Sequence, residues 1–80
     1  MAKRQVTFTF PQKLIKEPVI YDLSHKFEIV TNIRRADITA SKGWVVLELE
    51  GEEPEIERGL FWVKSTGVRV DPVVGDIVEG

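Results

Sequence analysis

The first hydrophobic pattern is an alternation near the N-terminus. Val6, Phe8 and Phe10 alternate with threonines, and this period of two is typical of a β-strand with one buried face. Pro11 follows directly, and proline cannot donate to the ladder of a central strand. The pattern therefore predicts a first strand over residues 6–10.

Apolar residues then recur at helical spacing in two places. The first set falls on one face of a helical wheel and follows Pro18, which the first turn of a helix tolerates. We expect this helix over about residues 18–27. The second set follows a run of glutamates, which the positive end of a helix dipole favours. The two sets are Val19, Ile20, Leu23 and Phe27, and Ile56, Leu60 and Val63.

Two glycines refine the prediction for the second helix. Gly67 is expected to be the left-handed residue that ends it. Gly59 costs a helix about 1 kcal/mol relative to alanine, and it borders the apolar stripe. A close approach between the two helices, or between a helix and the sheet, would explain its presence.

The phase of the alternation shifts within residues 29–40. Small or apolar residues occupy odd positions up to Ile33 and even positions from Ala36 onward. One extra residue at Arg34–Arg35, a β-bulge, would restore the buried face after this shift. We therefore expect Ile33 and Ala36 both to face the helices.

A hairpin and a short last strand complete the pattern. Residues 41–43 are expected to form the turn, with a glycine, Gly43, that is able to take a positive φ. Val45, Leu47 and Leu49 then resume the alternation, which predicts a third strand antiparallel to the second. Val68 and Val70 begin a fourth strand, which the following Pro72 marks as an edge strand.

The resulting order, βαββαβ, predicts an α+β ferredoxin-like fold: a four-stranded antiparallel sheet with two helices on one face. Right-handed crossovers place the first and third strands at the centre. A chain this short supports one domain over residues 1–80, with a core at about 5–74 and a flexible tail at 75–80. The expected core residues are Phe8, Phe10, Ile20, Phe27, Leu47, Leu49, Ile56 and Leu60.

Composition argues against several functions. The chain has no cysteine and a single histidine, His25, so we expect no metal site and no cofactor. No nucleophile and base occur in a recognisable arrangement, so we expect no enzymatic activity. The formal net charge of -2 argues against nucleic acid as a partner.

An RNA-binding module is the weakest alternative. Lys42, Gly43 and Trp44 resemble the start of the strand on which RNA-recognition modules stack bases. Val46 follows on the same face, however, and two glutamates come next, so one ring would be available for stacking. Trp44 and Val46 are better explained as a partly exposed sheet face or as the contact of a homodimer, which unpaired edge strands favour.

The N-terminus bears on location. After Met1-Ala2-Lys3-Arg4 the sequence alternates, without the uninterrupted apolar stretch of about seven to fifteen residues that a signal peptide needs. No segment approaches the length of a membrane span. We therefore expect a cytoplasmic protein that does not insert into a membrane.

Several short motifs together resemble one family, the NIL domain, a ferredoxin-like relative of the ACT regulatory domains. The resemblance covers the chain from Val6 to Val74. The family takes its name from an Asn-Ile-Leu run, and Arg34 stands in place of the leucine here. The motifs are Asn32-Ile33-Arg34-Arg35-Ala36-Asp37-Ile38-Thr39, then Gly43, Leu47-Glu48-Leu49-Glu50-Gly51 and Gly67-Val68-Arg69-Val70.

The resemblance implies a small non-catalytic regulatory or ligand-binding domain. NIL domains occur at the C-terminus of the ATP-binding subunit of methionine import transporters, are fused to iron-sulfur ferredoxin segments, or stand alone. With no ATPase part and no cysteine, this chain resembles the stand-alone or ferredoxin-associated branch. Its implied ligand is methionine or a similar amino acid. The alternative is a protein-interaction adaptor that docks on a transporter or on an iron-sulfur electron-transfer partner.

A ligand site is expected where the first strand leads into the first helix, near Phe10, Pro11 and Pro18. Asn32, with Ile33 beside it, is expected to face this site across a subunit boundary. Apolar walls would hold a thioether or aliphatic side chain, and backbone amides with the Asn32 amide would hold the charged ends. Asn32 has a second explanation of equal weight, as a cap of the connection between the helix and the second strand.

Overall fold

The computed structural model describes residues 1–73, so Val74 and the predicted tail at 75–80 lie outside the described residues. The element order confirms the predicted βαββαβ arrangement and adds a short 3-10 helix, η1, after the first strand. The elements are β1 (Ala2–Phe10), η1 (Gln12–Leu14), α1 (Val19–Lys26), β2 (Val30–Ile38), β3 (Gly43–Gly51), α2 (Glu53–Ser65) and β4 (Arg69–Pro72).

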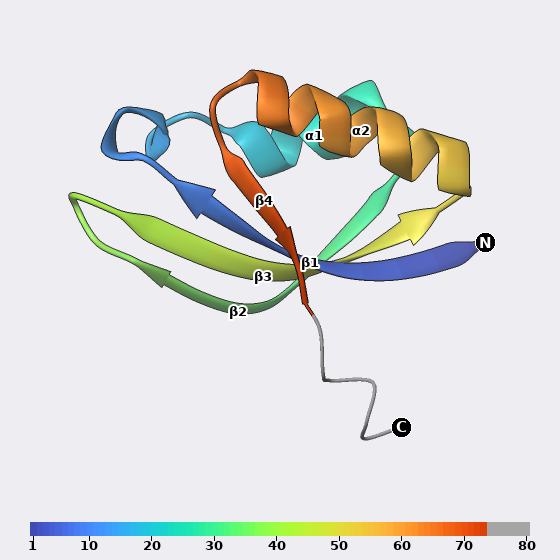
Figure 1. Ribbon diagram of the computed structural model, residues 1–80, viewed down its shortest axis with the longest axis horizontal. Helices are drawn as coiled ribbons and strands as arrows, with labels where there is room; N and C mark the ends of the chain where they lie inside the picture. The colour runs from blue at the N-terminus through green and yellow to red at the C-terminus, as the bar shows by residue number, and fades with distance from the viewer. Residues whose placement is uncertain (74–80) are drawn as a thin grey trace.

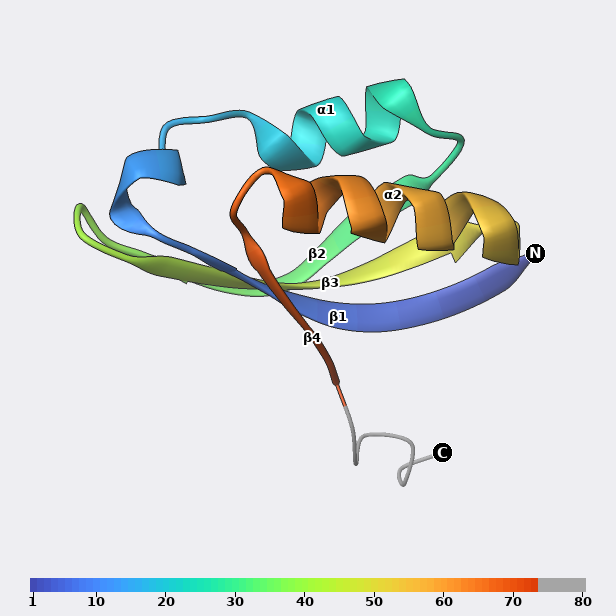
Figure 2. The same ribbon diagram turned by 45° about the horizontal axis from the view of Figure 1, so that its top comes forward.

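The four strands form one antiparallel sheet in the order β2-β3-β1-β4. Both helices lie on one side of this sheet, and its other face carries neither helix (Figures 1 and 2). The predicted α+β ferredoxin-like fold is therefore confirmed, with β1 and β3 at the centre. Pro72 lies in β4, which is an edge strand as predicted.

The central pair of strands is regular over its full length. β1 pairs with β3 from Ala2 opposite Gly51 to Phe10 opposite Gly43. The strand therefore begins four residues before the predicted start, because residues 2–5 continue the ladder although Lys3, Arg4 and Gln5 are polar. Directly opposite residues share a face of the sheet, and every second residue of β3 is buried beneath the helices.

The core forms between this central pair and the helices. All the predicted core residues are buried except Ile20 and Phe27, which are half-buried and pack against it. The buried apolar residues are Val6, Phe8, Phe10, Val19, Leu23, Ile29, Val45, Leu47, Leu49, Ile56, Leu60, Val63 and Val68.

The two helices approach each other closely at Gly59, as its position predicted. A Cβ atom at Gly59 would lie 2.9 Å from Cδ1 of Leu23 on α1 and 2.6 Å from Cδ1 of Ile29. At the end of α2, Gly67 has φ of 106°, and its N–H donates to the carbonyl of Lys64 at 3.1 Å. The left-handed helix end predicted at Gly67 is also confirmed.

The predicted bulge in β2 is present. Ile33 lies opposite Leu47 and Arg35 lies opposite Val46 on β3, so Arg34 is the extra residue. Arg34 has its own partner, since its Nη1 lies 3.5 Å from a carboxylate oxygen on β3. The shift in hydrophobic phase thus corresponds to a single inserted residue.

The bulge turns the later part of β2 as predicted, but the helices do not reach over this edge. Ala36 lies opposite Val45 and Ile33 opposite Leu47, and both β3 partners are buried on the helix side. Ile33 nevertheless remains 54% exposed and Ile38 55% exposed. The helix-side face of β2 is therefore an uncovered apolar margin of the sheet.

The β2–β3 turn differs from the prediction. Gly43 begins β3, and Gly67 is the one glycine with positive φ in the described part of the chain. The turn is closed by Thr39, whose N–H donates to the Lys42 carbonyl at 2.8 Å. Its Oγ1 accepts hydrogen bonds from the N–H groups of Ser41 and Lys42. Hydrogen bonds to the Thr39 side chain thus stabilise the turn, where a glycine with positive φ was expected to do so.

Candidate functional site

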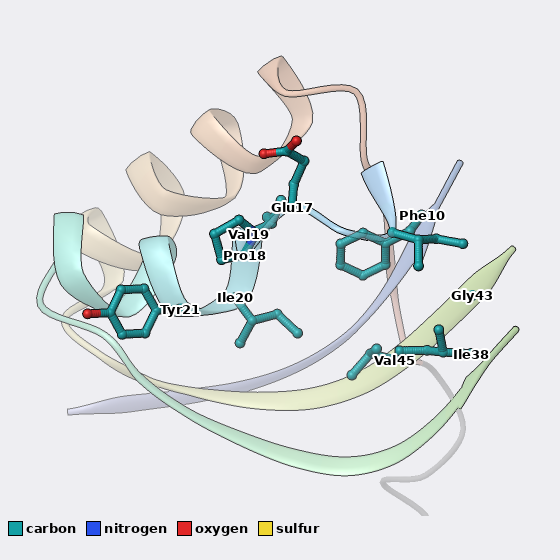
Figure 3. Close-up of a pocket in the computed structure, with 10 residues that line it drawn as sticks. Phe10, Glu17, Pro18, Val19, Ile20, Tyr21, Ile38, Gly43 and Val45 are labelled. Atoms are coloured by element: carbon teal, nitrogen blue, oxygen red, sulfur yellow. The ribbon is translucent and has the colours of Figure 1, made fainter. Parts of the chain in front are cut away.

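A pocket of about 200 Å³ lies between the start of α1 and the sheet, at the turn end of β2 and β3 (Figure 3). In Figures 1 and 2, η1 and the β2–β3 turn lie at the same end of the molecule. The fold therefore brings four separate segments together at this point. The lining residues are Phe10, Ile15, Glu17, Pro18, Val19, Ile20, Tyr21, Ile38, Gly43 and Val45.

The walls of this pocket are mostly apolar. Ile20 from α1 and Phe10 from β1 lie on opposite sides of it, with Ile38 and Val45 from the neighbouring strands (Figure 3). The carboxylate of Glu17 points away from this group of side chains. The cavity is thus suited to the apolar part of a small ligand, and polar recognition has to come from elsewhere.

The first turn of α1 supplies polar groups from its backbone. The N-cap residue is Pro18, which makes no side-chain capping bond. The Val19 N–H donates to the Glu17 carbonyl at 2.8 Å. In the described part of the chain, the N–H groups of Ile20 and Tyr21 donate to no backbone carbonyl. Free N–H groups at the positive end of a helix favour a carboxylate.

Part of the predicted ligand site lies together in this pocket. Phe10 and Pro18 both line it. Pro11 is exposed, immediately before η1, and does not line it. The junction of β1 and α1 is therefore hollowed as expected, at residues on either side of Pro11.

Asn32 and Ile33 do not line the pocket within one protomer. Asn32 lies opposite Glu48 of β3 and therefore on the sheet face away from the helices, because Glu48 alternates with buried residues. Ile33 lies on the helix side but beyond the pocket lining. A role for either residue requires a second copy of the chain and stays a prediction.

Eight of the ten lining residues were not among the predicted site residues, and three of these eight, Ile20, Ile38 and Val45, form the apolar walls together with Phe10. Ile20 was expected in the core, and Ile38 and Val45 were expected only as strand residues. The signal that would have found them is topological, because Ile38 is opposite Gly43 at the last rung before the turn. A glycine there leaves space above the sheet, and Ile38 Cγ1 would lie 3.0 Å from a Cβ at Gly43.

The predicted dimer contact lies on the open face of the sheet. Trp44 and Val46 are half-buried there. The Arg35 guanidinium lies 5.9 Å from the centre of the Trp44 ring, and Arg34 with Glu48 places further charge on β2 and β3. This face is mixed in charge rather than apolar, and its role in a dimer stays a prediction.

Other chemistry has little support among residues 1–73. His25 is exposed and stacks on Tyr21, with ring centroids 3.9 Å apart. No group of three or more His, Asp or Glu side chains within this range could hold a metal ion. Neither described helix is long and apolar enough to cross a membrane.

The fold and the pocket define a small ferredoxin-like domain with an apolar cavity beside the start of its first helix. The NIL domain family matches residues 4–72, and the chain belongs to this family. The resemblance found in the sequence is thereby confirmed, and it supports a small regulatory domain.

A solved structure supports the fold independently. It is the crystal structure of the C-terminal domain of an ABC transporter ATP-binding protein from Enterococcus faecalis, with a TM-score of 0.80 and 18% sequence identity. The match covers 91% of this chain and 86% of that chain. At this identity the likeness shows the fold alone. Comparison with curated proteins gives no match.

Proposed function

We propose that this domain binds a small amino acid with an apolar side chain, methionine first among them, and thereby regulates a protein with which it works in the cytoplasm. The observation that carries the proposal is the apolar pocket of about 200 Å³ beside the first turn of α1. Pockets for drug-sized ligands have volumes of about 300–1,000 Å³. A smaller cavity selects a ligand of amino-acid size.

The geometry supports a particular orientation of such a ligand. A thioether or aliphatic side chain would contact Phe10, Ile20 and Val45 inside the cavity. The α-carboxylate would accept hydrogen bonds from the free N–H groups of the first turn of α1. The ammonium group needs an acceptor, and the carboxylate of Glu17, the acidic side chain of the lining, points away from the cavity. The amide oxygen of Asn32 from a second copy is the candidate that the sequence suggested.

A charge placed in the pocket should weaken binding. We expect Ile20→Lys to weaken methionine binding at least tenfold, because burying an ammonium group in an apolar cavity is costly. The matched control is Val30→Lys, since Val30 is 61% exposed and does not line the pocket. Isothermal calorimetry on the unmodified chain and both variants measures the effect. Equal binding by the unmodified chain and Ile20→Lys would contradict the proposed site.

The adaptor function remains the alternative, and one surface feature favours it. Phe61 on α2 is 76% exposed, and exposed aromatic side chains often anchor protein interfaces. A transporter subunit is one candidate partner, because the similar fold from Enterococcus faecalis belongs to an ABC transporter ATP-binding protein. An electron-transfer protein is the other. The absence of methionine binding by a folded chain would favour this alternative.

A further inference from the structure

A second hollow adjoins the apolar pocket, between η1 and the β2–β3 turn. Its volume is about 460 Å³, and the two segments that form it lie at the same end of the molecule (Figures 1 and 2). Ile15 lines both this hollow and the apolar pocket. The two cavities therefore meet at one side chain. The hollow is lined by Gln12, Lys13, Ile15, Lys16 and Ala40.

The polar side chains of this hollow are hydrogen-bond donors. Lys13 and Lys16 carry ammonium groups, which donate and cannot accept, and the amide of Gln12 can donate as well. Among the described residues, no acidic side chain belongs to the lining. This basic hollow is therefore suited to an anion rather than to a cation or an apolar group.

Neither lysine of the basic hollow is neutralised within residues 1–73. Lys13 and Lys16 are exposed, and the ion pairs of this part of the chain are made by arginines. Glu17 is the next residue after Lys16, but it lines the apolar pocket and not the basic hollow. An anion bound here would thus gain from two positive charges without displacing a carboxylate.

The wall opposite η1 is a turn held by its own hydrogen bonds. Thr39 Oγ1 accepts from the N–H groups of Ser41 and Lys42. Ala40 lies between these residues, and its small side chain leaves the hollow open. In the part of the chain that the structure describes, the Ala40 N–H donates to no backbone carbonyl. The turn therefore adds a backbone donor beside the two lysines.

The overall negative charge of the chain does not oppose an anion at this place. Glutamates gather at the start of α2, with Glu53 and Glu55 in its first turn, and this start lies at the opposite end from η1 (Figure 1). The longest dimension of the molecule is 34 Å, whereas charges in solution are screened over about 8 Å at physiological ionic strength. The field at the basic hollow is therefore set by its own lysines.

We propose that the basic hollow binds the phosphate group of a small phosphorylated molecule whose apolar part occupies the adjoining pocket. A phosphate monoester carries a charge of about −1.5 to −2 at pH 7, which matches two ammonium groups better than a carboxylate does. Lysine is a common phosphate ligand and acts as a point charge. The inference rests on the apolar pocket being a ligand site, as proposed above, and not on methionine being the ligand.

This arrangement also makes the pocket a site of competition. An amino acid side chain and the apolar part of a phosphorylated ligand would occupy the same space between Phe10, Ile20 and Val45. Binding of one would exclude the other. The domain would then respond to the ratio of the two ligands rather than to the amino acid alone.

Butyl phosphate is the probe, because its aliphatic chain resembles a methionine side chain in length, and inorganic phosphate is its comparison. We expect butyl phosphate to bind about tenfold tighter or more, since its chain is removed from water in the apolar pocket. In an amide NMR titration at constant ionic strength, both anions should shift Lys13, Lys16 and Ala40. Butyl phosphate should also shift Phe10 and Ile20.

Charge reversal on either wall tests the site. Lys13→Glu/Lys16→Glu should weaken both anions about tenfold or more, because two attractive charges become repulsive. Ala40→Glu, on the turn, should weaken both as well. The matched control is Lys3→Glu, since Lys3 is exposed on β1, makes no ion pair within residues 1–73 and does not line the hollow. It should bind both anions as the unmodified chain does.

Equal binding of the anions by Lys13→Glu/Lys16→Glu and by Lys3→Glu would overturn the basic hollow as a site. Equal affinities for butyl phosphate and inorganic phosphate, or simultaneous binding of butyl phosphate and methionine, would overturn the joining of the two cavities. Methionine titrated alone separates this inference from the proposed function. If butyl phosphate binds and methionine does not, the amino acid proposal fails and the phosphate site stands, and the converse result overturns the phosphate site alone.

Discussion

Replacing Phe8 by alanine is expected to destabilise the domain by about 3–5 kcal/mol. Phe8 is fully buried on the central strand β1, opposite Val45 of β3 and Val70 of β4. Its ring meets that of Phe10 edge to face, with centroids 6.3 Å apart. Removing it leaves a cavity in the hydrophobic core. Because small domains have a total stability of about 5–15 kcal/mol, this loss is a large fraction of the whole.

Urea unfolding followed by circular dichroism measures the effect. The matched control is Thr9→Ala, since Thr9 is exposed on the next position of the same strand, and surface changes stay within about 0.5 kcal/mol. Ile56→Val, at a fully buried position of α2, should lie between the two at about 0.5–1.5 kcal/mol. Equal stabilities for Phe8→Ala and Thr9→Ala would contradict the described core.

Gly51→Ala is expected to be more damaging than Gly59→Ala, although a Cβ at either position would approach a neighbouring atom to less than 3.0 Å. A Cβ at Gly51 would lie 2.8 Å from the Glu28 carbonyl oxygen, a backbone atom that cannot rotate away. The strand end or the α1–β2 connection would have to move, at a cost of about 1–3 kcal/mol. Gly59 offers the comparison, because the atoms within 3 Å of its Cβ are the terminal methyl groups of Leu23 and Ile29.

The Gly59→Ala variant should therefore be much milder. Side-chain methyl groups can move by changing their rotamers, and alanine in a helix is favoured over glycine by about 1 kcal/mol. We expect a stability close to that of the unmodified chain, which thermal unfolding of both variants would test side by side. A larger loss for Gly59→Ala than for Gly51→Ala would show that the helices, rather than the strand end, are the less yielding contact.

Much of the fold follows from hydrophobic periodicity. The alternation from Val6 to Phe10 predicts β1, and the shift in phase around Arg34 predicts the bulge in β2. Both predictions are possible because a period of two defines which face of a strand is buried. Residues 2–5 were missed because Lys3, Arg4 and Gln5 are polar and show no alternation, yet pairing with a regular neighbouring strand holds them in the sheet. The turn at Thr39 was missed because side-chain oxygens and glycines can both close a turn.

The site was less accessible from sequence, for a geometric reason. The predicted site lay at the junction of β1 and α1, and Phe10 and Pro18 from this junction both line the pocket. The contribution of Ile38 and Val45 depends on the β2–β3 turn lying at the same end of the molecule as that junction, which is a matter of tertiary arrangement. The exposure of Ile33 similarly depends on how far the helices extend across the sheet. The local sequence pattern does not predict that extent.

An amide NMR titration of the unmodified chain with methionine tests the proposed function most directly. The account predicts saturable shifts that cluster at Phe10, Ile20 and Gly43, and their loss in Ile20→Lys. Weakened shifts in Asn32→Ala would show that a second copy completes the site. No shifts at millimolar methionine in a folded chain, or shifts confined to the open face around Trp44, would contradict it.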